Sequence, residues 1–111
     1  MGKHIFCNMA DLGEEKSLGL EVKVNGKVHR LFAVKKNSWQ RVFYNSCPHI
    51  GAPLNILPNK FLDSDKKYIL CSNHGALFNI EDGYCIKGPC IKESLTPAKF
   101  EVEGGRLFVY I

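Results

Sequence analysis

Two short segments of the chain each combine a cysteine with a histidine at close spacing. Cys47 is followed by His49, and Cys71 is followed by His74. Thiolate sulfur and neutral imidazole nitrogen are ligands that proteins use for zinc and for iron–sulfur centres. Residues 50–70 separate the two pairs, which is enough chain for two loops to meet at one end of a β structure. The spacing therefore predicts two metal-binding loops.

A glycine follows each histidine within two residues, Gly51 in the first segment and Gly75 in the second. Because glycine has no side chain, we expect both residues to allow close approach of the backbone. Zinc fingers pair cysteine with cysteine and histidine with histidine, whereas each segment here mixes the two ligand types. A binuclear cluster explains this mixture, since one iron can take both thiolates and the other both imidazoles. The pattern favours an iron–sulfur cluster over zinc.

The segments C-P-H-I-G-A-P at residues 47–53 and C-S-N-H-G-A-L-F at residues 71–78 resemble the two cluster-binding loops of the Rieske family. The resemblance extends over residues 40–111, where Gly88 and Pro89 are similar to the family's cluster-capping proline loop. It implies one [2Fe–2S] cluster per chain. It also implies an all-β Rieske fold of stacked antiparallel sheets, with the two cluster-binding loops at one tip.

The resemblance also implies a role for each ligand. Cys47 and Cys71 would bind the buried iron, and His49 and His74 would bind the outer, partly exposed iron. Two neutral imidazoles in place of two thiolates make the centre less negative, so that an electron is added more easily than to an all-cysteine cluster.

Four positions near these ligands point to the lower part of the Rieske range of potentials. High-potential relatives carry two further cysteines that tie the cluster loops together, and the matching residues here are Ala52 and Asn73. Those relatives also carry serine and tyrosine hydroxyls that donate to sulfur, where this chain has Ala76 and Phe78. Fewer donors stabilise the reduced cluster less. We expect a potential on the order of −150 mV.

The rest of the sequence predicts short strands separated by turns. Asn25-Gly26 and Gly104-Gly105 are typical of tight turns between strands. Asp11–Lys16 is expected to form either a short helix or a loop, and no other stretch is expected to be helical. Leu54–Lys66 resembles an insertion that would enlarge the loop near the cluster. The predicted strands are Leu20–Val24, Val28–Val34, Arg41–Tyr44, Tyr68–Leu70, Ala76–Ile80, Lys99–Glu103 and Leu107–Ile111.

Length and composition agree with this reading. The 111 residues, 45% hydrophobic and 23% charged, predict a single domain over residues 1–111, and the resemblance implies that it is a Rieske domain. No apolar run is long enough to cross a membrane and no secretory signal is recognisable, which predicts a cytoplasmic protein. Five cysteines, an odd number, favour metal binding plus free thiols, the latter at Cys7, Cys85 and Cys90.

These observations predict a soluble monomer that carries single electrons to an oxygenase or another oxidoreductase, rather than an enzyme. Its partners would be redox proteins, including a reductase. The net charge of +4 is scattered along the chain, which favours a partner with an acidic face over nucleic acid. Two alternatives remain open: a small subunit of a larger oxidoreductase, similar to that of nitrite reductase, and a redox or iron sensor.

Overall fold

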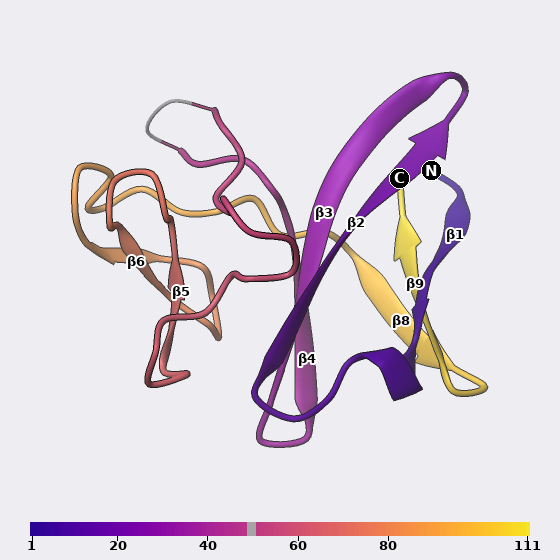
Figure 1. Ribbon diagram of the computed structural model, residues 1–111. Coiled ribbons are helices and arrows are strands. Elements are labelled where there is room, and N and C mark those ends of the chain that lie inside the picture. The colour runs from indigo at the N-terminus through magenta and orange to yellow at the C-terminus, as the bar shows by residue number, and fades with distance from the viewer. Residues whose placement is uncertain (49–50) are drawn as a thin grey trace.

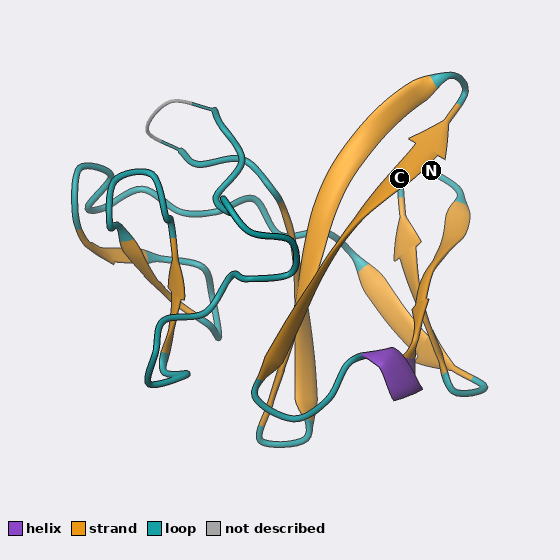
Figure 2. Cartoon of the chain, viewed as in Figure 1, coloured by secondary structure: helices purple, strands orange, loops and turns teal. Residues whose placement is uncertain are grey.

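The computed structural model describes residues 1–48 and 51–111, and antiparallel strands dominate this part of the chain. The strands form three sheets, with the orders β1-β9-β8, β2-β3-β4 and β5-β6-β7 (Figures 1 and 2). The predicted all-β fold of antiparallel sheets is confirmed. The elements are β1 (Lys3–Asn8), a 3-10 turn (Met9–Asp11), β2 (Lys16–Val24), β3 (Lys27–Lys36), β4 (Trp39–Tyr44), β5 (Tyr68–Leu70), β6 (Leu77–Asn79), β7 (Cys85–Lys87), β8 (Phe100–Glu103) and β9 (Arg106–Tyr110).

Strand β3 separates two hydrophobic cores. Side chains alternate across a strand, so that Leu31 and Ala33 enter one core while Phe32 and Val34 enter the other. The first core is shared with Leu107 and the sheet β1-β9-β8. The second core lies toward β5, β6 and the cluster-binding loops. Burial on both faces explains why the middle of β3 is continuously apolar.

The N-terminal segment differs from the sequence prediction. The short helical turn covers Met9–Asp11 and ends before most of the predicted range Asp11–Lys16. The N–H of Glu15 instead donates to the carbonyl of Lys35, and β2 begins at the next residue. Pairing with β3 therefore overrides the local helical tendency. Strands β1 and β7 were not predicted, and no helix of the described residues is long and apolar enough to span a membrane.

The segment Leu54–Lys66 contains no named strand, as expected of a loop, and part of it docks on the neighbouring sheets. Asn59 docks on β2, accepting from the hydroxyl of Ser17 at 2.7 Å and from the N–H of Gly19 at 2.9 Å. The N–H of Leu70 donates to the carbonyl of Phe61 at 2.8 Å, so the end of the segment pairs with β5. Residues 59–61 are thus attached to β2 and β5, whereas Leu54, at the start of the segment, accepts a hydrogen bond from Ser72 in the second metal loop.

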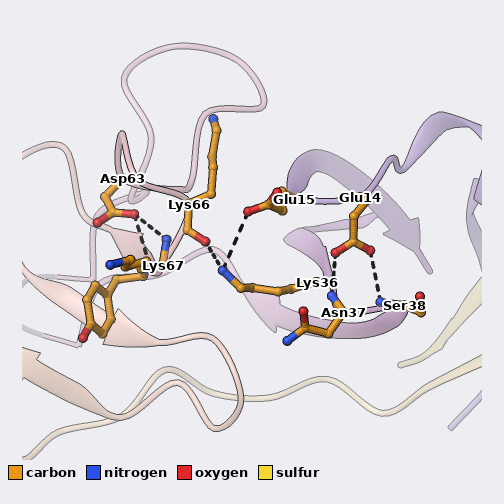
Figure 3. Close-up of polar contacts among 9 residues, drawn as sticks. Glu14, Glu15, Lys36, Asn37, Ser38, Asp63, Lys66 and Lys67 are labelled. Carbon is orange, nitrogen blue, oxygen red and sulfur yellow. Dashed lines mark hydrogen bonds and ion pairs between the residues drawn. The ribbon is translucent and has the colours of Figure 1, made fainter.

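Polar contacts hold the far end of this segment (Figure 3). The carboxylate of Asp63 accepts from the N–H of Lys67 at 2.9 Å, which closes the turn before β5. The ammonium of Lys36, at the end of β3, donates to the carbonyl of Lys66. Beside it, Glu14 accepts from the backbone of the β3–β4 turn. Three separate chain segments therefore meet at this end of the central sheet.

Candidate metal centre

The two predicted metal loops share one backbone hydrogen-bond pattern. In the first loop the N–H of Cys47 donates to the carbonyl of Ala52, and the N–H of Gly51 donates back to the carbonyl of Cys47, both at 2.7 Å. In the second loop Cys71 and Ala76 make the first bond, and Gly75 and Cys71 the second, both at 2.9 Å. Each loop is therefore a small closed ring that begins at its cysteine.

The glycines of both loops adopt a backbone conformation that other residues avoid. Gly51 and Gly75 have φ angles of +73° and +70°, in the region that a residue with a Cβ avoids. Among the described atoms, an added Cβ would meet nothing within 4 Å at Gly75, and only the Ser46 hydroxyl oxygen, at 3.9 Å, at Gly51. The described residues therefore require glycine at both positions for backbone conformation.

One backbone and one side-chain hydrogen bond fasten the two loops to each other. The N–H of Ser72 donates to the carbonyl of Leu54 at 2.8 Å, and the side-chain amide of Asn73 donates to the carbonyl of Pro53 at 2.8 Å. Asn45 closes the base of the first loop, because its side-chain oxygen accepts from the N–H of Leu54 at 2.8 Å. Asn45 was not predicted as a site residue, since a lone asparagine before a cysteine carries no metal-ligand signal.

The predicted ligands divide by exposure. Cys47 and Cys71 are fully buried, whereas His74 is exposed. Burial raises the pKa of Cys71, and the backbone N–H groups of Asn73 and His74, which face its sulfur, act in the opposite direction. The neighbouring thiol of Cys47 raises the same pKa further. The two thiols therefore lie together inside the protein, and an imidazole lies at its surface.

The fourth predicted ligand, His49, lies outside the described residues. Within the described part of the chain, no group of three or more His, Cys, Asp and Glu side chains is arranged to hold a single metal ion. The donors that are described nevertheless fit a [2Fe–2S] cluster. Two adjacent buried thiols suit one iron, and N–H groups aimed at a sulfur stabilise its negative charge.

The predicted capping segment packs against the second loop. Gly88 has a φ of +101°, and a Cβ on it would lie 2.8 Å from the Cα of Ala76. Here a glycine is required for close approach as well as for conformation. Gly88 and Pro89 are both exposed, so this segment covers the loop from the outside.

A second pair of thiols follows the capping segment. Cys90 and Cys85 are buried with their sulfur atoms 3.1 Å apart, and neither forms a disulfide. Burial is the main reason that the pKa of Cys90 is raised to about 12, and contacts with Cys85 and Cys47 contribute. Cys90 therefore lies in the same buried core as Cys47, a predicted ligand. Both cysteines were expected to be free thiols, and they are.

The family model for the Rieske [2Fe-2S] domain matches residues 2–108. The chain belongs to the Rieske family. Its cofactor is accordingly a [2Fe–2S] cluster. The match covers the N-terminal strands as well, which the loop motifs alone did not identify. Comparison with curated protein sequences gives no match.

Solved structures of Rieske proteins share the fold. The ferredoxin of carbazole 1,9a-dioxygenase from Nocardioides aromaticivorans IC177 has a TM-score of 0.73 and 17% identity, covering 98% of this chain and 97% of that one. A chain in the complex of reduced oxygenase and oxidised ferredoxin of carbazole 1,9a-dioxygenase has a TM-score of 0.73 and 22% identity, covering 96% and 91%.

Larger Rieske proteins contain the same fold as one part. The terminal oxygenase of carbazole 1,9a-dioxygenase from N. aromaticivorans IC177 has a TM-score of 0.75 and 21% identity, and 98% of this chain covers 30% of that chain. In a carbazole-bound oxygenase and ferredoxin complex, the chain spans 28% of the matched chain, with a TM-score of 0.76. At these identities the likeness establishes the fold.

Proposed function

We propose that this Rieske protein is a ferredoxin that passes single electrons to an oxygenase. The observation that carries the proposal is the pairing of buried Cys71 with exposed His74 in one closed loop. Such a loop holds a cluster inside the protein while presenting an imidazole edge to a partner. The chain also matches nearly the whole length of ferredoxins, whereas it spans under a third of the oxygenase chains.

We assign the ligands as predicted, with Cys47 and Cys71 on the inner iron and His49 and His74 on the outer iron. The cluster supplies a one-electron couple. The protein holds the two thiolates away from water, directs the N–H groups of Asn73 and His74 at the Cys71 sulfur, and caps the second loop with Gly88 and Pro89.

Exposed apolar side chains adjoin these loops and suit a transient partner. Ile56 and Leu57, which are 68% and 57% exposed, closely follow Leu54, whose carbonyl accepts from the second loop. Ile86 and Ile91, on either side of the capping segment, are 37% and 56% exposed. Apolar contacts with nearby lysines favour docking on a partially apolar, acidic face. We further propose a single-domain, monomeric carrier in the cytoplasm, which is not an enzyme by itself.

Metal analysis and EPR test the ligand assignment. We expect two irons and two acid-labile sulfides per chain, and a low average g value after dithionite reduction. His49→Cys and His74→Ala should alter or abolish this signal, whereas His29→Ala, on β3, should leave it unchanged. Bound zinc, or a signal unaffected by both ligand variants, would refute the assignment.

A single-turnover reaction tests the carrier function. Reduced protein is mixed anaerobically with an oxidised Rieske oxygenase, and the visible absorption of both clusters is followed. Electron transfer that weakens with rising salt is the expected result, because docking is partly electrostatic. Copurification with a large oxidoreductase on gel filtration, with no transfer to the oxygenase, would instead support the bound-subunit alternative.

A further inference from the structure

Cys85 and Cys90 form a thiol pair that electron transfer through the cluster does not use. Their sulfur atoms are 3.1 Å apart, longer than a disulfide bond of about 2.05 Å but within reach of a small side-chain rotation. The thiol of Cys85 donates to the carbonyl of Lys87 at 3.3 Å. The two thiols are therefore hydrogen-bonded and close enough for a disulfide bond to form between them.

The backbone keeps this pair together. The N–H of Cys85 donates to the carbonyl of Glu93 at 2.8 Å, and the N–H of Lys92 donates to the carbonyl of Cys85 at 3.3 Å. These bonds close a hairpin whose turn contains Gly88 and Pro89. A bond between Cys85 and Cys90 would therefore fasten the capping segment across its base.

We propose that Cys85 and Cys90 form a reversible disulfide that locks the capping segment and alters the cluster beside it. Both side chains are at most 1% exposed. An oxidant can reach them only when residues 86–91 move away from the second loop. Disulfides of cytosolic proteins are typically transient and redox-sensing, which agrees with a thiol pair that is protected while the segment is closed.

The oxidant we name is a low-molecular-weight disulfide. One thiolate of the pair attacks it, forming a mixed disulfide and releasing one small thiol. The second thiolate attacks the protein sulfur of that mixed disulfide and releases the other small thiol. The pair loses two electrons and two protons, and the small disulfide gains both. Excess small thiol reverses the reaction.

Cys90 connects the pair to the cluster because it lies in the same buried core as Cys47. Its thiol donates to the Cys85 sulfur in this structure, and because a metal-bound thiolate is the stronger acceptor, the same proton can turn to the Cys47 sulfur when the cluster is bound. Oxidation of Cys90 removes that donor. Since donors to sulfur stabilise the more negative, reduced cluster, we expect the locked protein to have a lower midpoint potential.

Peptide mapping of the cluster-loaded protein tests the bond. The protein is incubated anaerobically with graded ratios of oxidised to reduced glutathione, alkylated during denaturation and digested with trypsin. Cleavage after Lys67, Lys87 and Lys92 separates the two cysteines. The expected product is peptide 68–87 linked to peptide 88–92, with fragment ions that assign the bond to Cys85 rather than Cys71. Added dithiothreitol should abolish it.

Variants and cluster content provide the controls. Cys85→Ser and Cys90→Ser should each abolish the linked peptide, whereas Cys7→Ser, a buried thiol of the other core, should keep it. Iron content and visible absorption must stay unchanged during oxidation. Absence of the linked peptide at every ratio, or bonds to Cys47 or Cys71 instead, would overturn the proposal. The peptide map of the wild-type protein tests the proposal even if a variant fails to fold.

Spectroelectrochemical titration tests the effect on the cluster. The oxidised protein should have a lower midpoint potential than the reduced protein, and Cys7→Ser should show the same shift. An identical potential in both states would overturn the coupling to the cluster. Neither readout needs a partner enzyme, so these results are independent of whether the protein serves an oxygenase.

Discussion

Cys47 and Cys71 begin two loops with the same backbone ring, although their histidines do not occupy the same position in it. Both rings place glycine at the fifth position and alanine at the sixth. The histidine is third in one loop and fourth in the other. The described ends of the two loops thus share one hydrogen-bond pattern, and in both the glycine provides the positive φ angle.

Hydrogen-bond donors around the sulfur atoms of the cluster and its ligands should set the midpoint potential. Ala76 and Phe78 are fully buried beside the second loop and carry no hydroxyl. We expect Ala76→Ser and Phe78→Tyr each to raise the midpoint potential. A donor that favours the reduced cluster by about 1 kcal/mol corresponds to roughly 40 mV for one electron.

Spectroelectrochemical titration measures this change. Phe108→Tyr, on β9 in the other sheet layer, adds the same hydroxyl away from the loops and should leave the potential unchanged. Unchanged potentials in both loop variants, with the cluster intact, would contradict the donor argument. So would a wild-type potential above roughly +100 mV, near the middle of the Rieske range.

At the scale of secondary-structure elements, glycines in turns meet two needs, a positive φ angle and close approach to another backbone. Gly88 and Gly104 both have positive φ angles, +101° and +60°. Only Gly88 lies against another backbone, that of Ala76. Comparing Gly104 with Gly88 therefore distinguishes a glycine required for its backbone conformation alone from one that is also required for close packing.

Alanine at these two glycines should have unequal effects. Gly104→Ala should cost about 1–2 kcal/mol for the left-handed backbone conformation. Gly88→Ala should cost about 1–3 kcal/mol more, because its Cβ overlaps Ala76. Urea unfolding of the cluster-loaded proteins measures both. Equal costs would mean that the capping segment moves freely away from the second loop.

The β3–β4 turn depends on one carboxylate. Asn37 and Ser38 both adopt positive φ angles, and their N–H groups donate to Glu14 at 2.6 and 3.0 Å. These bonds lower the pKa of Glu14, that of Ser38 contributing most. Because the folded-state pKa lies below the ordinary value, this stabilisation is complete above the ordinary pKa. It is lost as the pH falls through the folded-state pKa.

NMR titration of the amide protons tests this pH dependence. The Asn37 and Ser38 amide shifts should change with a midpoint that gives a Glu14 pKa below that of an ordinary glutamate. Glu14→Gln should remove the titration, whereas Glu15→Gln should preserve it. A midpoint at the ordinary glutamate value would show that the carboxylate does not hold the turn.

At the scale of the whole molecule, Phe61 joins the segment between the cluster loops to the central sheet. Its ring stacks on Phe32 of β3 with centroids 4.3 Å apart and planes 4° from parallel. Gly19 of β2 makes this possible, because a Cβ there would lie 2.8 Å from the Phe61 ring. The cluster-bearing half of the protein is thereby anchored to β2 and β3.

Removing the Phe61 ring should destabilise both the cluster-bearing half of the protein and the central sheet. Phe61 is fully buried, and Phe61→Ala should lower the free energy of unfolding by about 3–5 kcal/mol. Leu57→Ala, at an exposed position of the same segment, should change it by no more than about 0.5 kcal/mol. Urea unfolding followed by circular dichroism and by cluster absorption compares the two. Similar costs for both variants would contradict the anchoring role.

Local patterns in the sequence were sufficient for the family, the all-β class and most strand positions. Alternating side chains and turn residues are local features, and the strands Tyr68–Leu70 and Lys99–Glu103 lie within a residue of their predicted bounds. The paired cysteines and histidines likewise carry their chemistry within a few residues. The ligand assignment itself stays a prediction, and His49 lies outside the described residues.

Only the tertiary structure decided how distant segments meet. The sequence left a helix and a loop open for Asp11–Lys16, and the pairing of Glu15 with Lys35 decided against the helix. The stack of Phe61 on Phe32 drew a predicted loop onto the central sheet. The contact of Cys90 with Cys85 required a hairpin closed by backbone hydrogen bonds. Each depends on partners that neighbouring residues do not specify, because packing free energy comes from surfaces brought together only in the folded chain.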